Sequence, residues 1–290
     1  MSLLTPEELR ELRRLHINAG RRVDSLFAGE YRSAVRGQGM EFEEVRAYVP
    51  GDDVRHIDWN VTARTGEPFI KVFREERQTT VFLVVDVSGS ARVGSGGRDG
   101  RTTRRLQIAR IAGGITYAGI RNQDRVGLIT FSDRVEVALH PRRTRGHAWA
   151  VIQKVYEAAG QSRGTDLSEA LSTVRRMQRR RAVVIVVSDF LDDGPWPTAL
   201  ATISRRHRVH ALCVHDPLDA GWTGLGLMDV VDAETGRRRL VDGARLAQQW
   251  SVEERLRTLR RSGARAAAIS TQDDAFALLH LHFQREALRR

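Results

Sequence analysis

The sequence predicts an α/β fold, a doubly wound and mostly parallel sheet with helices on both faces, preceded by an N-terminal helical and irregular extension. Short apolar runs rich in β-branched residues recur after residue 78, as expected of strands buried on both faces of a parallel sheet. Longer stretches with helical spacing separate these runs, which is typical of parallel strands joined by helices. We therefore expect residues 1–77 to form the extension and residues 78–290 to form the α/β domain.

Five apolar runs are the predicted parallel strands: 81–86, 126–131, 182–189, 209–214 and 265–270. We expect residues 134–139 to form an antiparallel edge strand beside 126–131. The segments MDVVD and RRRLV, on either side of Glu234–Gly236, predict a second hairpin. The predicted helices lie between the strands, at 104–120, 147–159, 166–180, 197–206, 244–261 and 273–288.

The extension divides into a helical part and an irregular part. Residues 5–36 have helical spacing, with Thr5 as the expected N-cap, Pro6 in the first turn and Glu8 completing a capping box. Residues 37–80 carry the turn signals GQG, YVPGDD and RTGEP. Within them, residues 69–73 alternate between apolar and other side chains, so we expect a strand there.

Composition indicates a globular protein of the cytoplasm. Hydrophobic residues make up 41% of the 290 residues and charged residues 29%, which is ordinary for soluble domains. No apolar run reaches the ~18 residues of a membrane-spanning helix. The N-terminus is charged and lacks the apolar region of a signal peptide. Cys213 is the single cysteine, which excludes an internal disulfide framework and favours a reducing compartment.

The formal net charge of +11 raises the alternative of an arginine-mediated nucleic-acid binder. Almost all of the basic residues are arginines, since Lys71 and Lys154 are the only lysines, and they are spread along the chain. Only 6% of residues are aromatic, so platforms for stacking bases are scarce. We favour arginine-rich residue usage over a nucleic-acid partner.

The first core strand ends in DVSGS, which places Asp86, Ser88 and Ser90 beyond its carboxyl end. Ligands of open α/β sheets bind in the crevice at that edge. Carboxylate and hydroxyl oxygens suit Mg²⁺ or Mn²⁺ rather than zinc. Thr165 precedes another predicted helix and Asp189 ends another predicted strand, so both are expected at the same edge. Asp166 is expected to stabilise the start of its helix rather than to bind metal.

This order, D-x-S-x-S followed by a threonine and then an aspartate, resembles the metal-ion-dependent adhesion site of von Willebrand factor A domains. In that family the serine and threonine hydroxyls contact the metal, and the carboxylates act directly or through water. A remaining coordination position is left for a partner's carboxylate. The resemblance implies a von Willebrand factor A-like fold and the metal ligands Asp86, Ser88, Ser90, Thr165 and Asp189.

Residues 37–77 resemble the signature region of a bacterial family, domain of unknown function 58. The stretch EFEEVRAYVPGDDVRHIDWNVTART carries the resemblance, and DRVGLITFSD, VVSDF and the D-x-E-T-G at 232–236 extend it over nearly the whole chain. Many members are encoded beside a MoxR-type AAA+ ATPase. The resemblance therefore implies a metal-site protein that is the adaptor or partner of such an ATPase.

An acidic cluster in this signature region admits two interpretations. Its residues are Asp52, Asp53, Arg55, His56, Asp58 and Trp59. As a Mg²⁺-dependent hydrolase or nuclease site, the carboxylates would hold the ion and the histidine would be a general base. As a structural or partner-binding segment, the acids would cap a short helical turn and pair with arginines, and the tryptophan would pack against the domain. We favour the second interpretation.

Other candidate sites have simpler interpretations. Ser88 lacks the G-x-S-x-G context of a nucleophile. Cys213 lies in an apolar strand, as a core residue does, and His207, His210 and His215 lack a zinc-binding pattern. Together these observations predict a non-enzymatic, metal-dependent protein-interaction module.

Overall fold

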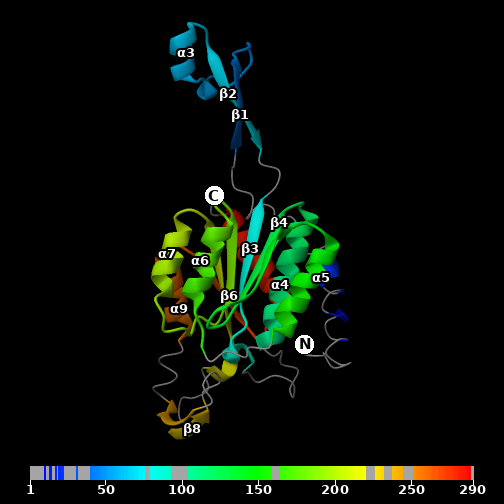
Figure 1. Cartoon of the computed structure of the whole chain (residues 1–290), viewed down its shortest axis with the longest axis vertical. Helices are drawn as coiled ribbons and strands as arrows, with labels where there is room; N and C mark the ends of the chain where they lie inside the picture. Colours follow the sequence, from blue (N-terminus) through cyan, green and yellow to red (C-terminus); the bar gives the residue numbers. More distant parts are fainter. Residues whose placement is uncertain are drawn as a thin grey trace.

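The computed structural model describes residues 10, 13–14, 17, 19–22, 31, 40–75, 79–92, 104–158, 164–219, 226–231, 237–243 and 251–288. These residues form an α/β body from which a small hairpin unit extends at one end (Figure 1). No described helix is long and apolar enough to cross a membrane.

The body is built on a six-stranded sheet with the order β10-β7-β6-β3-β4-β5. Its strands are β3 (Thr80–Asp86), β4 (Arg125–Phe131), β5 (Val135–Arg142), β6 (Val183–Ser188), β7 (Arg208–His215) and β10 (Arg265–Ser270). All neighbours pair in parallel except β5, which runs antiparallel to β4. This is the strand order of doubly wound folds, and the predicted fold class and edge strand are confirmed.

Helices cover both faces of the sheet (Figure 1). One face carries α4 (Arg104–Arg121), α5 (Arg145–Glu157) and α10 (Ala275–Leu288), and the other carries α6 (Leu167–Met177), α7 (Trp196–Ser204) and α9 (Val252–Arg261). Successive side chains of β3 point to opposite faces of the sheet. Leu83 and Val85 therefore pack in the core on the first face, and Phe82 and Val84 in the core on the second. The helix predicted at 244–261 begins at Val252, and residues 244–250 lie outside the described residues.

The described residues before residue 32 are helical and lie against the body. Tyr31 is fully buried, and its ring meets that of Phe283 edge to face at 5.5 Å. Arg22 forms an ion pair with Asp274 at the start of α10. The capping box expected at residues 5–8 lies outside the described residues, and the boundary expected after residue 77 stays a prediction.

The hairpin unit consists of β1 (Met40–Ala47), η1 (Val54–His56), α3 (Trp59–Thr65) and β2 (Phe69–Glu75), with β1 and β2 antiparallel. The strand predicted at 69–73 is confirmed. Its partner β1 was not predicted, because its sequence MEFEEVRA is too charged for an apolar pattern to stand out. Gly51 turns the chain with a φ of 108°, a conformation that favours glycine.

A second hairpin pairs β8 (Leu227–Val231) with β9 (Arg238–Asp242), as predicted. It lies at the end of the body opposite the first hairpin unit (Figure 1). Two short 3₁₀ helices follow sheet strands, η2 (Gly89–Arg92) after β3 and η3 (Pro217–Asp219) after β7. Both bring polar residues to the carboxyl edge of the sheet.

Candidate metal centre

The candidate centre lies where β3 and β6 end side by side. The chain after β3 leads to β4 on one side, and the chain after β6 leads to β7 on the other. Doubly wound folds bind ligands at this kind of switch point. Val85 pairs in register with Val187, so the next residues, Asp86 and Ser188, face each other. The sheet itself therefore places a carboxylate and a hydroxyl together.

The D-x-S-x-S loop holds its side chains in one buried cluster. The backbone N–H of Ser88 donates to Asp86 Oδ1 at 2.9 Å, and Ser188 Oγ donates to Asp86 Oδ2 at 2.6 Å. The hydroxyls of Ser88 and Ser90 lie 3.1 Å apart. Asp86 and Ser88 are buried. Three of the predicted ligands are thus brought together, and their oxygens are held by the loop and by β6.

Asp189 is buried on the neighbouring loop. Its Oδ1 accepts from the N–H of Leu191 at 3.1 Å, and its Oδ2 accepts from Arg104 at 3.1 Å. The next residue, Phe190, has a φ of 55°, which is strained for a bulky side chain. The Ser188 hydroxyl accepts from the N–H of Phe190 at 3.0 Å and holds this turn in place.

Thr165 lies at the same edge of the sheet, ahead of α6. The N–H of Asp166 donates to the carbonyl of Ser132 at 2.7 Å, and the N–H of Val87 donates to the carbonyl of Phe131 at 2.8 Å. The end of β4 therefore holds both the D-x-S-x-S loop and the turn that carries Thr165. Asp166 caps α6 by accepting from the N–H of Glu169, which confirms its expected role at the start of the helix. Metal binding by Thr165 stays a prediction.

Arg104 is a central residue of the site that the sequence did not reveal. Its guanidinium is buried and donates to Asp189, to the Ser90 carbonyl at 3.2 Å, and to both carboxylate oxygens of Asp219 at 2.8 and 2.7 Å. Arg255 donates to the Asp189 carbonyl from α9. Nothing marks these two residues among the many arginines of the chain, because their role depends on carboxylates far away in sequence.

Burial governs the electrostatics of the centre. Burial and, after it, the neighbouring charge of Asp189 raise the pKa of Asp86 to about 7, against the hydrogen bonds from Ser188 and Ser88, which lower it. Taking a carboxylate out of water disfavours its charged form. A cation in addition to Arg104 is therefore needed if Asp86 and Asp189 are both to be ionised.

The donor set fits a hard divalent cation. It consists of two carboxylates and neighbouring hydroxyls, all oxygen ligands of the kind that Mg²⁺ and Mn²⁺ prefer. Among the described residues no three His, Cys, Asp or Glu side chains gather as a metal-binding group, so a zinc-type set is not found there. Asp86 is the feature that a divalent ion would satisfy, because its buried carboxylate has no cation partner among the described residues, whereas Asp189 is paired with Arg104.

The acidic cluster of the hairpin unit is engaged in its own fold. Asp52 accepts from both terminal nitrogens of Arg46 at 2.8 Å, which lowers its pKa. Asp53 caps η1 and pairs with Arg55, whose hydrogen bonds lower the pKa of Asp53 to about 2. As predicted, these acids cap a short helical turn or pair with arginines.

Two details of the cluster differ from expectation. Asp58 caps α3 and pairs with Lys71 at 3.3 Å rather than with an arginine. The expected packing of Trp59 against the domain is wrong, since its side chain is 70% exposed. The reason is that α3 sits on a hairpin that extends away from the body, where no core is near enough to cover it (Figure 1).

Comparisons with known proteins agree with the resemblance found in the sequence. The family described as "Protein of unknown function DUF58" matches residues 44–261. Uncharacterized protein Mb1516 of Mycobacterium bovis and uncharacterized protein Rv1480 of Mycobacterium tuberculosis are each 32% identical over 273 residues, covering 93% of this chain and 81% of theirs.

Among solved structures, the conserved hypothetical protein BatB from Bacteroides thetaiotaomicron is 15% identical, with a TM-score of 0.48, over 72% of this chain and 99% of its own. Proximal thread matrix protein 1 from the mussel byssus, with a zinc-occupied MIDAS motif, is 13% identical, with a TM-score of 0.43, over 71% of this chain and 47% of its own. Likeness at this level says nothing about activity. By its sequence, this chain belongs to the DUF58 family of proteins of unknown function.

Proposed function

We propose that this protein is a non-enzymatic, metal-dependent protein-interaction module, and that its partner is a MoxR-type AAA+ ATPase or a client of one. Asp86, Ser88, Ser90, Thr165 and Asp189 would hold Mg²⁺ or Mn²⁺. When bound, such an ion offers a coordination position that can exchange water for a carboxylate of the partner.

The observation that carries this proposal is the buried carboxylate of Asp86. It accepts hydrogen bonds from Ser88 and Ser188, and among the described residues it has no cation partner. The neighbouring acids Asp189 and Asp219 share the buried Arg104. Buried charges are costly unless they are paired, and one divalent cation supplies the missing charge.

The residues around the ligands would hold them in position. Ser188 and the N–H of Ser88 orient the two oxygens of Asp86, and Arg104 orients Asp189. Asp219 in turn holds Arg104. The lone pairs that these hydrogen bonds leave free are the ones available to an ion. Such preorganisation limits the entropy that metal binding would cost.

The partner's identity rests on the family resemblance, and the hairpin unit supports a second contact with it. Asp52, Asp53, Arg55, His56, Asp58 and Trp59 would form this second contact. The exposed indole of Trp59 is the residue type that most often anchors protein interfaces. A hydrolase centre here is not favoured, because the three carboxylates are each held by their own cation.

Calorimetric titration of Mg²⁺ and Mn²⁺ into chelator-stripped protein tests the metal centre. The wild type should bind saturably, and Asp86→Asn, which preserves shape and the contact with Ser188, should not. Asp193→Ala is the matched control, since Asp193 is an exposed acid that follows β6 at the same edge of the sheet. Equal binding by Asp86→Asn and wild type would contradict the assignment.

The partner is tested separately, with the purified MoxR-type ATPase encoded by the same genome immobilised on a sensor. Binding should require Mg²⁺, should be abolished by chelator, and should be lost in Asp86→Asn but not in Asp193→Ala. Full binding in chelator would show that any contact with the ATPase does not pass through the metal.

A further inference from the structure

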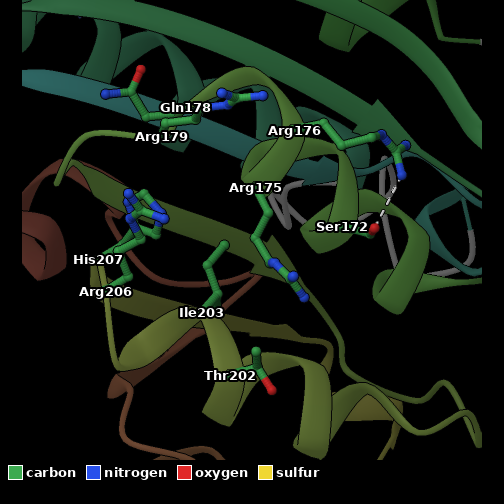
Figure 2. A pocket seen from close by; sticks show the side chains of 9 residues that line it. All are labelled: Ser172, Arg175, Arg176, Gln178, Arg179, Thr202, Ile203, Arg206 and His207. Atoms are coloured by element: carbon green, nitrogen blue, oxygen red, sulfur yellow. Dashed lines mark hydrogen bonds between the residues drawn. The ribbon is translucent and has the colours of Figure 1, made fainter.

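A second polar site lies at the opposite edge of the sheet from the metal centre. A hollow of about 400 Å³ opens between the last turns of α6 and α7 and the segments that follow them (Figure 2). These segments lead into the amino ends of β6 and β7, whereas the metal centre lies at carboxyl ends. The hollow is therefore separate from the candidate metal centre, and its size is within the range of small-molecule pockets.

Its lining is strongly cationic. Arg175, Arg176, Arg179 and Arg206 border the hollow, and none of the described residues that line it is acidic. Arg176 is held by Glu169 at 2.8 Å and donates to Ser172 at 3.0 Å, turned away from the other arginines (Figure 2). The other three are exposed, and among the described residues their guanidinium groups have no hydrogen-bond or ion-pair partner.

Stabilisation of helix ends accounts for only part of this charge. Arg175 lies in the last turn of α6, where a cation complements the helix dipole. Arg179 and Arg206 lie beyond the ends of their helices. Each helix C-terminus contributes about half a negative charge. The two helix ends together therefore offset only about one of the three guanidinium charges. The hollow keeps a net positive charge.

His207 is the second, independent observation. It borders the hollow, it is only 3% exposed, and neither ring nitrogen has a hydrogen-bond partner among the described residues. Buried polar groups are almost always paired. Burial, together with the charge of Arg206, lowers the pKa of His207, so near neutral pH the ring keeps one N–H to donate. A ligand oxygen in the hollow would pair it.

We propose that this hollow binds a small phosphate-bearing anion through Arg175, Arg179, Arg206 and the ring of His207. Guanidinium groups and an N–H donor match phosphate oxygens, and guanidiniums bind them in forked pairs. In the part of the chain that the structure describes, His207 is the only aromatic ring that lines the hollow, so bases of a nucleic acid would find little to stack on. The phosphate groups of the ligand are therefore what the site recognises.

Calorimetric titration of inorganic pyrophosphate into the full chain tests this proposal. Chelator is present throughout, so that the metal centre cannot contribute. At physiological salt the wild type should bind saturably. The double variant Arg179→Ala/Arg206→Ala should bind at least about tenfold more weakly. The matched control is Arg180→Ala/Arg205→Ala, which removes the same charge from the adjacent residues outside the hollow and should leave the affinity within about twofold.

His207→Leu tests the buried ring, with unfolding by urea as the check that the variant is folded. It should also lose affinity for pyrophosphate, although it changes no arginine. Equal losses in the two double variants would mean diffuse charge attraction and overturn the proposal, as would absence of saturable binding by the wild type. A single-stranded oligonucleotide that binds more tightly than pyrophosphate and weakens equally in both double variants would assign the surface to nucleic acid instead.

Discussion

At the scale of single residues, the candidate metal centre depends on a cation that the protein itself supplies. Arg104 joins Asp189 to Asp219 across two loops, and all three side chains are buried. A buried pair of this kind contributes less to stability than its geometry suggests, because both ions have left water. Removing one partner is nevertheless costly, since the other charge is left buried alone.

We predict that Arg104→Met lowers the free energy of unfolding by about 3–5 kcal/mol. The variant leaves the carboxylates of Asp189 and Asp219 without their shared cation. Urea unfolding measures the change, and Arg121→Met, at the exposed end of the same helix, should change stability by less than about 0.5 kcal/mol. Adding Asp219→Asn to Arg104→Met should recover part of the loss, and failure to do so would contradict the pairing.

At the scale of elements, two adjacent residues before α6 have different expected roles. The carboxylate of Asp166 caps the helix by accepting from the N–H of Glu169 at 3.0 Å. Thr165, the residue before it, is proposed as a metal ligand. The same turn therefore stabilises a helix with one side chain and would complete the metal centre with the other.

We predict that Asp166→Ala lowers the free energy of unfolding by about 1 kcal/mol, because it removes the N-cap, and leaves Mg²⁺ affinity unchanged. Thr165→Val keeps the shape of the side chain but removes the hydroxyl, and should weaken Mg²⁺ binding. Urea unfolding and calorimetry on both variants give the comparison. The reverse pattern, with metal affinity lost only in Asp166→Ala, would assign the ligand to Asp166.

The hairpin unit is the second element with a separable role. Its acids hold its own loops in place, and Trp59 lies exposed on α3. Trp59→Ala should therefore change the free energy of unfolding by less than about 0.5 kcal/mol. It should weaken binding of the ATPase by at least about tenfold, as loss of an interface anchor does.

Leu240→Ala is the control, since Leu240 is 68% exposed on the other hairpin. It should leave the affinity for the ATPase unchanged, and calorimetry should show unchanged Mg²⁺ binding in both variants. Equal affinity of the Trp59 variant and the wild type for the ATPase would remove the hairpin unit from the proposed interface.

At the scale of the whole molecule, charge is distributed unevenly between the two edges of the sheet. The carboxyl edge gathers buried acids, and the amino edge around α6 and α7 gathers arginines. Although the formal net charge is +11, the candidate metal centre at the carboxyl edge is therefore a site rich in acidic side chains. A cation bound at that site would stabilise the folded chain as a whole, because the unfolded chain does not assemble the ligands.

We predict that Mg²⁺ at about 100 times its dissociation constant raises the free energy of unfolding by about 2.7 kcal/mol. The melting temperature should rise by about 5 °C or more, measured by circular dichroism after chelator treatment. Asp86→Asn should show no such rise, and monovalent salt at matched ionic strength should not reproduce it. An equal rise in both proteins would indicate a general salt effect.

How much of this architecture the sequence predicts depends on how far apart in the sequence the contacting residues lie. The apolar runs at 81–86 and 182–189 are local signals, and they correctly predicted the core strands β3 and β6. The D-x-S-x-S loop was readable for the same reason, since Ser88 and Ser90 meet within a few residues of Asp86. The sequence did not predict the exposure of Trp59, because that exposure depends on the direction in which the hairpin unit extends from the body.

By itself, the sequence determined the doubly wound fold, the carboxyl edge at which its polar residues gather, and the family to which the chain belongs. Only the tertiary structure decided which charges meet. Arg104 contacts Asp189 and Asp219 across 85 and 115 residues, and the hollow joins the ends of two helices with His207 beneath them. Such contacts follow from the packing of elements, and an arginine-rich sequence does not mark which arginines take part.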